Sequence, residues 1–83
     1  MKLQDQIESR LTHAFQPSEL AVVNESNRHS GHSGDDGSGE SHFAIRIRAA
    51  QLAAMSRVAR HRAVQAALGD INQRAHAIAL DIG

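Results

Sequence analysis

The chain contains no cysteine, tryptophan or tyrosine, and it has one proline and two phenylalanines among its 83 residues. The lack of cysteine excludes disulfide bonds and thiol nucleophiles. With so few aromatic side chains, the core has to be built from leucine, isoleucine, valine and alanine. No apolar run approaches the roughly 18 residues that a membrane-spanning helix needs, so no membrane segment is expected.

The length predicts one domain over residues 1–83, with room for one core. The first ten residues, MKLQDQIESR, carry charges where a signal peptide needs an apolar stretch, so we expect a cytoplasmic protein. No nucleophile motif, phosphate-binding glycine loop or pair of carboxylates in an apolar setting is present. The sequence therefore predicts neither an enzyme nor a small-molecule substrate.

The charges balance, with nine Lys and Arg against nine Asp and Glu, but they are separated along the chain. The stretch from Ser41 to Gly69 has no carboxylate and contains five arginines: Arg46, Arg48, Arg57, Arg60 and Arg62. A neutral protein can therefore still present one basic surface. Such a surface would contact a partner protein or nucleic acid, or would simply be solvated.

Two segments have the composition of helices. In the first, apolar residues recur every four positions: Leu3, Ile7, Leu11 and Phe15. Pro17 ends this helix, because proline restricts the residue before it to extended geometry. The second segment, residues 49–69, is rich in alanine and predicts a short turn followed by a longer helix that stops near Gly69.

Three segments are typical of strands. Residues 19–25 are short and rich in valine, and residues 42–49 alternate, with Phe43, Ile45 and Ile47 on one face. Residues 75–82 form the last predicted strand, which places His76 on the inward face with Ile78, Leu80 and Ile82. The order α-β-β-α-β predicts an α+β domain with helices on one face of a three-stranded mixed sheet. The first two strands should be antiparallel and the last two parallel.

The loop between the first two strands, Asn27–Ser41, collects histidine and glycine. It holds His29, His32 and four of the six glycines. Glycine and serine favour mobility, and loops of this length are usually functional or disordered. Two interpretations stay open: a solvated loop, or a metal site, because neutral imidazole is the commonest side-chain ligand. Two histidines alone do not complete a zinc site.

Two more histidines lie in the predicted helices. His61 lies at the edge of the apolar stripe of the second helix, where a half-buried structural role and a ligand role are both open. His13 lies in the first helix and is expected on the surface, whereas the inward-facing His76 is expected to be structural.

Taken in order, several segments resemble the BolA family over nearly the whole chain. The first helix ends in AFQP, the first strand and loop entry read ELAVVNESNRH, and GSGESHFAIRI is similar to the GSESHF second strand of that family. LAAMSRVARHRAVQAAL resembles the signature F-x-G-x(5)-R-H-R followed by an apolar helix, and AHAIAL closes the match. Leu52 and Ala54 stand where the signature has Phe and Gly.

The resemblance implies a fold like a class II KH domain and a non-enzymatic adaptor function in iron–sulfur trafficking or iron and stress regulation. BolA-like proteins pair with monothiol glutaredoxins and share a [2Fe–2S] cluster bound with glutathione. On this chain the resemblance assigns the ligands to His61 and His29, with His32 as the alternative to His29. No cluster is expected on the isolated chain. The alternative function is a DNA-binding transcriptional regulator that uses the KH-like fold and its basic face.

Overall fold

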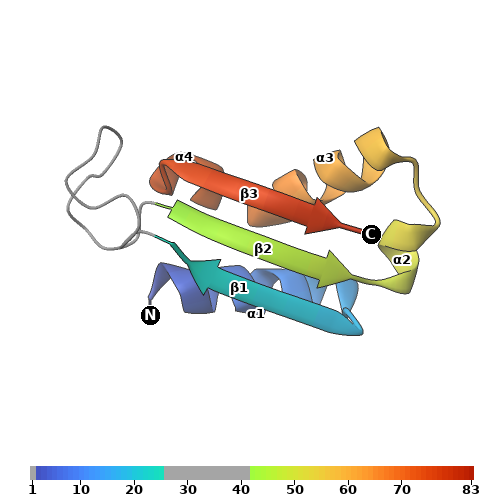
Figure 1. Ribbon diagram of the computed structural model, residues 1–83, viewed down its shortest axis with the longest axis horizontal. Coiled ribbons are helices and arrows are strands. Elements are labelled where there is room, and N and C mark those ends of the chain that lie inside the picture. Colours follow the sequence, from blue (N-terminus) through green and yellow to red (C-terminus); the bar gives the residue numbers. More distant parts are fainter. Residues whose placement is uncertain (1, 26–41) are drawn as a thin grey trace.

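The computed structural model describes residues 2–25 and 42–83 (Figure 1). Its elements follow in the order α1 (Leu3–Phe15), β1 (Glu19–Asn24), β2 (His42–Arg48), α2 (Ala50–Ala53), α3 (Arg57–Leu68), α4 (Ile71–Arg74) and β3 (Ala77–Ile82). The predicted α+β fold is confirmed, and so is the division of residues 49–69 into a short turn, α2, and a longer helix, α3. The single turn α4 was not predicted.

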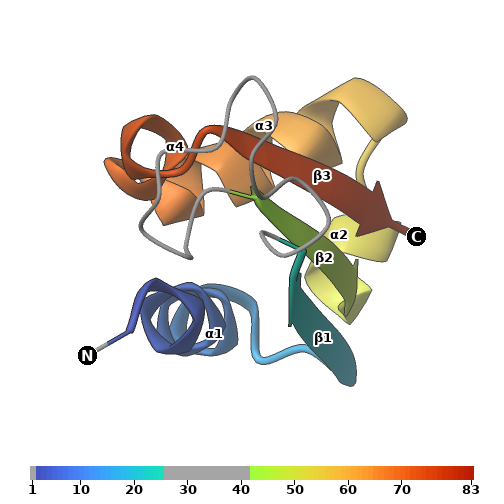
Figure 2. The same ribbon diagram turned by 60° about the vertical axis from the view of Figure 1, so that its left-hand side comes forward.

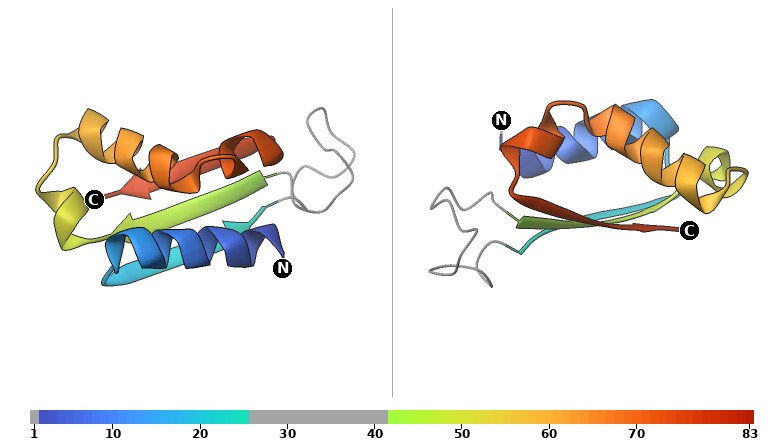
Figure 3. Two further views of the ribbon diagram at one scale, coloured as in Figure 1. Left: turned by 180° about the vertical axis from the view of Figure 1, so that it is seen from behind. Right: turned by 90° about the horizontal axis from the view of Figure 1, so that it is seen from above.

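The three strands form one mixed sheet in the order β1-β2-β3. β1 pairs with β2 in antiparallel orientation, and β2 pairs with β3 in parallel orientation, as predicted. All four helices lie on one side of the sheet, which is clearest in the view from above in Figure 3. Figure 2 looks nearly along α1 and shows it on the same side of the sheet as α3 and α4. Within residues 2–25 and 42–83, the opposite face of the sheet carries no helix.

The core lies between the helices and the inner face of the sheet. The stripe of α1 buries Leu3, Ile7 and Leu11, while α3 contributes Val64 and Leu68. The alternation of β2 buries three side chains against them: Phe43, Ile45 and Ile47. Burying an aliphatic or aromatic side chain of this size stabilises the fold by roughly 1.5–3 kcal/mol. Aliphatic side chains thus form most of this core, as the shortage of aromatic residues predicted.

Both long helices end where the sequence indicates, with one difference in geometry. α1 ends at Phe15 before Pro17, but Gln16 adopts a left-handed conformation with φ of 47° rather than the expected extended one. This conformation lets the Gln16 N–H donate to the Thr12 carbonyl, so the last turn keeps a backbone partner. α3 begins after Ser56, whose hydroxyl accepts a hydrogen bond from the Ala59 N–H.

The expected inward position of His76, at one end of the sheet, is wrong. His76 is exposed and does not face the core, because β3 begins only at Ala77 and the strand alternation does not extend to His76. His42, which the alternation of β2 places on the outer face, is 8% exposed and therefore buried. The two rings lie against each other, with centroids 5.2 Å apart.

Within residues 2–25 and 42–83, no helix is long and apolar enough to cross a membrane.

Candidate functional site

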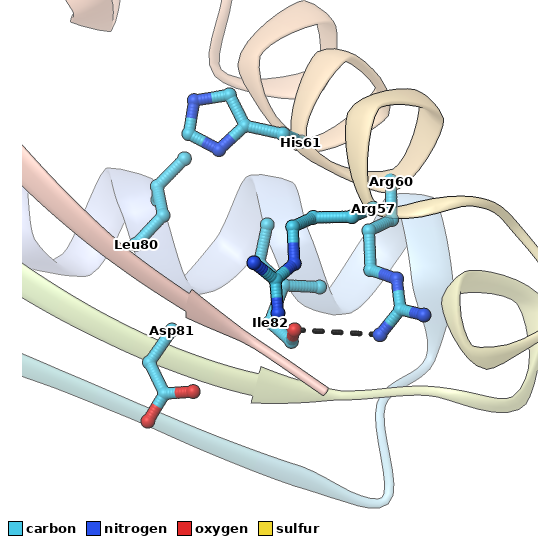
Figure 4. A pocket seen from close by; sticks show the side chains of 6 residues that line it. All are labelled: Arg57, Arg60, His61, Leu80, Asp81 and Ile82. Atoms are coloured by element: carbon cyan, nitrogen blue, oxygen red, sulfur yellow. Dashed lines mark hydrogen bonds between the residues drawn. The ribbon is translucent and has the colours of Figure 1, made fainter.

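A pocket of about 360 Å³ lies between α3 and the end of β3. We call it the α3–β3 groove, and its lining residues are Arg57, Arg60, His61, Leu80, Asp81 and Ile82. Figure 4 shows the side chains of Arg57, Arg60 and His61 extending from α3 toward β3. Positions four apart on a helix share a face, which is why Arg57 and His61 both reach the groove.

Arg60 connects the two sides of the groove through its guanidinium group. It donates hydrogen bonds to the Met55 carbonyl oxygen at 3.2 Å and to the Ile82 carbonyl oxygen at 3.4 Å. Its Nε atom is buried without a hydrogen-bond partner. Of the five arginines predicted to contact a partner or nucleic acid, Arg60 therefore has its donors directed at the backbone of its own chain.

The other cationic side chains of α3 are exposed to solvent. Arg57, His61 and Arg62 are all exposed, and none of them forms a hydrogen bond or an ion pair within the described part of the chain. Arg62 does not line the α3–β3 groove; it lies in a second depression on α3, which Arg57 and His61 also line. These side chains are therefore available to an external ligand, whereas Arg60 is not.

The two arginines of β2 lie on the opposite face of the sheet. Arg46 pairs with Glu19, and this carboxylate raises the pKa of the Arg46 guanidinium. Arg48 pairs with Asp81 at 2.9 Å and also donates to the Asp81 carbonyl oxygen. The five arginines are thus divided between two faces, and those of β2 are neutralised by neighbouring acids. The expectation of one shared basic surface is wrong, because β2 directs its polar positions away from the helices.

His42 and His76 lie together at the end of the sheet where β2 begins. The Glu25 N–H donates to the His42 carbonyl oxygen at 2.8 Å, so the two described residues that flank residues 26–41 are joined by a hydrogen bond. Ala77, the residue after His76, is the ladder partner of His42. The sequence predicts a structural role for His76 and does not place it beside His42. The predicted parallel pairing of the last two strands could have indicated this position, because it brings the first residues of those strands together.

The structure does not bring His61 and His76 together. His61 lies beside Leu80, whose ladder partner Ile45 is three residues beyond His42 along β2. At about 3.3 Å per strand residue, this separation is roughly 10 Å along the sheet. The other predicted ligands, His29 and His32, lie outside the described residues. His13 is exposed on α1, as expected.

The family model described as BolA-like protein matches residues 11–82 of the chain. The chain belongs to the BolA family. A Sinorhizobium protein described by its position in the cobS 5′ region is 47% identical over 83 residues, covering 98% of this chain and 89% of that protein. The DNA-binding transcriptional regulator BolA of Vibrio cholerae is 39% identical over 79 residues, covering 94% and 71%.

The fold of the BolA family is also found in the structural comparison. The BolA domain of SufE1 from Arabidopsis thaliana superposes with a TM-score of 0.83 at 29% identity, covering 99% of this chain and 91% of that one. The family assignment made from the ordered motifs is therefore confirmed. The likeness to a class II KH domain stays a prediction.

Proposed function

We propose that this BolA family member is a non-enzymatic adaptor that pairs with a monothiol glutaredoxin and shares a [2Fe–2S] cluster with it. Its role would lie in iron–sulfur trafficking or in iron and stress regulation. The observation that supports the proposal best is an exposed histidine, His76, beside His42 on a family member that has no cysteine.

The donor set of the chain fits half of such a site. A [2Fe–2S] cluster is held by four ligands, usually thiolates, and two histidines can replace two of the thiolates on one iron. This chain offers imidazoles and no thiolate, so the remaining two ligands would be thiolates from glutaredoxin and glutathione. The site is consequently one that two proteins complete together.

The ligand from the folded domain has two candidates. The resemblance assigns His61, and the structure adds His76. The geometry favours His76, because it lies next to His42, and Glu25 and His42 are the described residues that flank the segment carrying His29 and His32. A ligand from that segment then has a shorter distance to span than toward His61, which lies roughly 10 Å further along β3.

Cluster transfer in solution tests the proposal. The chain would be mixed anaerobically with a monothiol glutaredoxin that carries a glutathione-bound cluster, and the visible absorption and circular dichroism spectra would be recorded. We expect a new spectrum of the mixed complex and no colour when the chain is reconstituted alone. The proposal is abandoned if the spectrum of the glutaredoxin cluster stays unchanged on mixing.

Three histidine variants then locate the ligand. We expect His76→Ala to abolish the mixed spectrum, His61→Ala to leave it, and His13→Ala to serve as the matched exposed control. Loss on His61→Ala with retention on His76→Ala would instead support the assignment from the resemblance. Retention in both single variants would remove both histidines from the site.

DNA-binding transcriptional regulation is the second candidate function. The relative from Vibrio cholerae is named a DNA-binding transcriptional regulator, and a Haemophilus influenzae relative that is 35% identical has the same name. On this chain the exposed Arg57 and Arg62 of α3 are the cations that such a role would use. A titration of a promoter fragment at several salt concentrations tests it, since phosphate contacts make affinity fall steeply with salt.

A further inference from the structure

Among the residues that the structure describes, β3 is an edge strand with backbone groups that no other strand uses. It pairs with β2 on one side only, because β2 occupies the centre of the sheet. The Gly83 N–H donates to the Ile47 carbonyl oxygen of β2. The odd-numbered residues of β3 therefore direct their backbone N–H and C=O groups toward β2. Backbone groups alternate along a strand, and those of Ile78, Leu80 and Ile82 therefore face the free edge.

The position of Arg60 agrees with this alternation. Its guanidinium reaches the Ile82 carbonyl oxygen from the α3 side, which is the side of the free edge (Figure 4). The backbone N–H and C=O groups of Ile78 and Leu80 point away from β2 and have no hydrogen-bond partner among the described residues. An edge of this kind is a template for a further strand, because it presents donors and acceptors in a row.

The groove beside this edge is positively charged. Arg57 extends into it with no partner of its own in the described ranges, and α3 contains no acidic residue. The carboxylate of Asp81 is paired with Arg48 on the other face of the sheet. The half-buried side chains of Leu80 and Ile82 add apolar surface to the floor of the groove.

We propose that the α3–β3 groove binds an extended acidic segment of a partner protein, which adds a strand to the free edge of β3 and places a carboxylate against Arg57. A protein segment suits the groove better than single-stranded nucleic acid, which binds by stacking its bases on exposed aromatic rings. Phe43 is 2% exposed and Phe15 is partly buried, and the chain has no other aromatic residue apart from histidine. The docking surface requires no cluster, so it stands independently of the proposed cluster function.

Backbone hydrogen exchange gives the sharpest test. The full chain would be titrated with a blocked peptide in which glutamate and valine alternate, and amide exchange would be followed by NMR. We expect new protection at the edge-facing amides of Ile78, Leu80 and Ile82. The amides of Ala79 and Asp81 should change little, because β2 already protects them. Binding without protection of the edge-facing amides would overturn strand addition.

Two substitutions that remove one charge each from α3 separate the groove from general electrostatic attraction. Arg57 lines the groove and Arg62 does not. We expect Arg57→Gln to weaken binding of the acidic peptide roughly fivefold, the upper range for an exposed ion pair, and Arg62→Gln to leave it unchanged. Equal losses of affinity in both variants would refute binding of the peptide in the α3–β3 groove.

Two further probes establish which kind of partner the groove accepts. A peptide with lysine in place of glutamate should not bind, because it would place a cation against Arg57. A single-stranded oligonucleotide should not protect the same amides. If the oligonucleotide protects them and the acidic peptide does not, the proposed partner class is wrong.

Discussion

Replacing Arg60 by methionine should destabilise the fold, although this arginine lies in a run of cations that resembles a binding surface. Methionine keeps an unbranched apolar stem and removes the guanidinium group. The substitution therefore leaves the Met55 and Ile82 carbonyl oxygens without the donors that they have at 3.2 and 3.4 Å. Both bonds are partly buried, so water replaces them incompletely.

The expected loss follows from these contacts. A hydrogen bond from a charged donor contributes roughly 1.5–3 kcal/mol, and both bonds here are longer than the preferred distance, so each falls at or below the lower end. Removing the buried Nε atom, which has no partner, offsets about 1 kcal/mol. The net loss should be about 1–2 kcal/mol, which lowers the melting temperature of a domain of this size by roughly 5–15 °C.

Thermal and urea denaturation of Arg60→Met and Arg62→Met would measure this difference. Arg62 has the same charge, lies two residues away and has no partner in the described part of the chain, so its replacement should change stability by less than about 0.5 kcal/mol. Equal stability of the two variants would refute the structural role of Arg60. It would return Arg60 to the set of side chains available for a partner or for nucleic acid.

Three further predictions concern the core, an ion pair and DNA. Ile47→Ala should cost about 2–5 kcal/mol in urea denaturation, because Ile47 is 0% exposed, whereas Val23→Ala at 51% exposure should cost little. The hydrogen bond from Arg10 lowers the pKa of Asp70, so its stabilisation is present above the unfolded-state pKa and is lost as pH falls through the folded-state pKa. Asp70→Asn should therefore reduce stability at neutral pH, and the difference from the parent should vanish in strong acid. If Arg57 and Arg62 contact phosphates, replacing both should reduce the slope of log affinity against log salt by about 0.9 per contact, and an unchanged slope would contradict DNA contact through α3.

The family could be identified from the order of its motifs, because each matched segment also carries its own local structure. The spacing of Leu3, Ile7 and Leu11 predicts one buried helix face, and the alternation from Phe43 predicts one buried strand face. Both signals depend on the period of a single element, so they need no knowledge of distant contacts. Pro17 and Gly69 likewise indicate where the helices end.

The candidate site was harder to predict, because it depends on which elements become neighbours. The run from Arg46 to Arg62 looks like one basic block, but β2 directs its arginines to the bare face of the sheet, where Glu19 and Asp81 pair with them. The partners are 27 and 33 residues away in sequence, a separation that no local pattern encodes.

The histidines show the same division between local and tertiary information. The sequence by itself determined that the chain offers imidazoles and no thiolate, since composition alone decides this. Only the tertiary structure decided that His76 is exposed beside His42, while His61 lies further along β3 in a groove beside Arg57. The parallel pairing of β2 with β3 causes this arrangement, because it aligns the first residues of two strands that are separated by three helices along the chain.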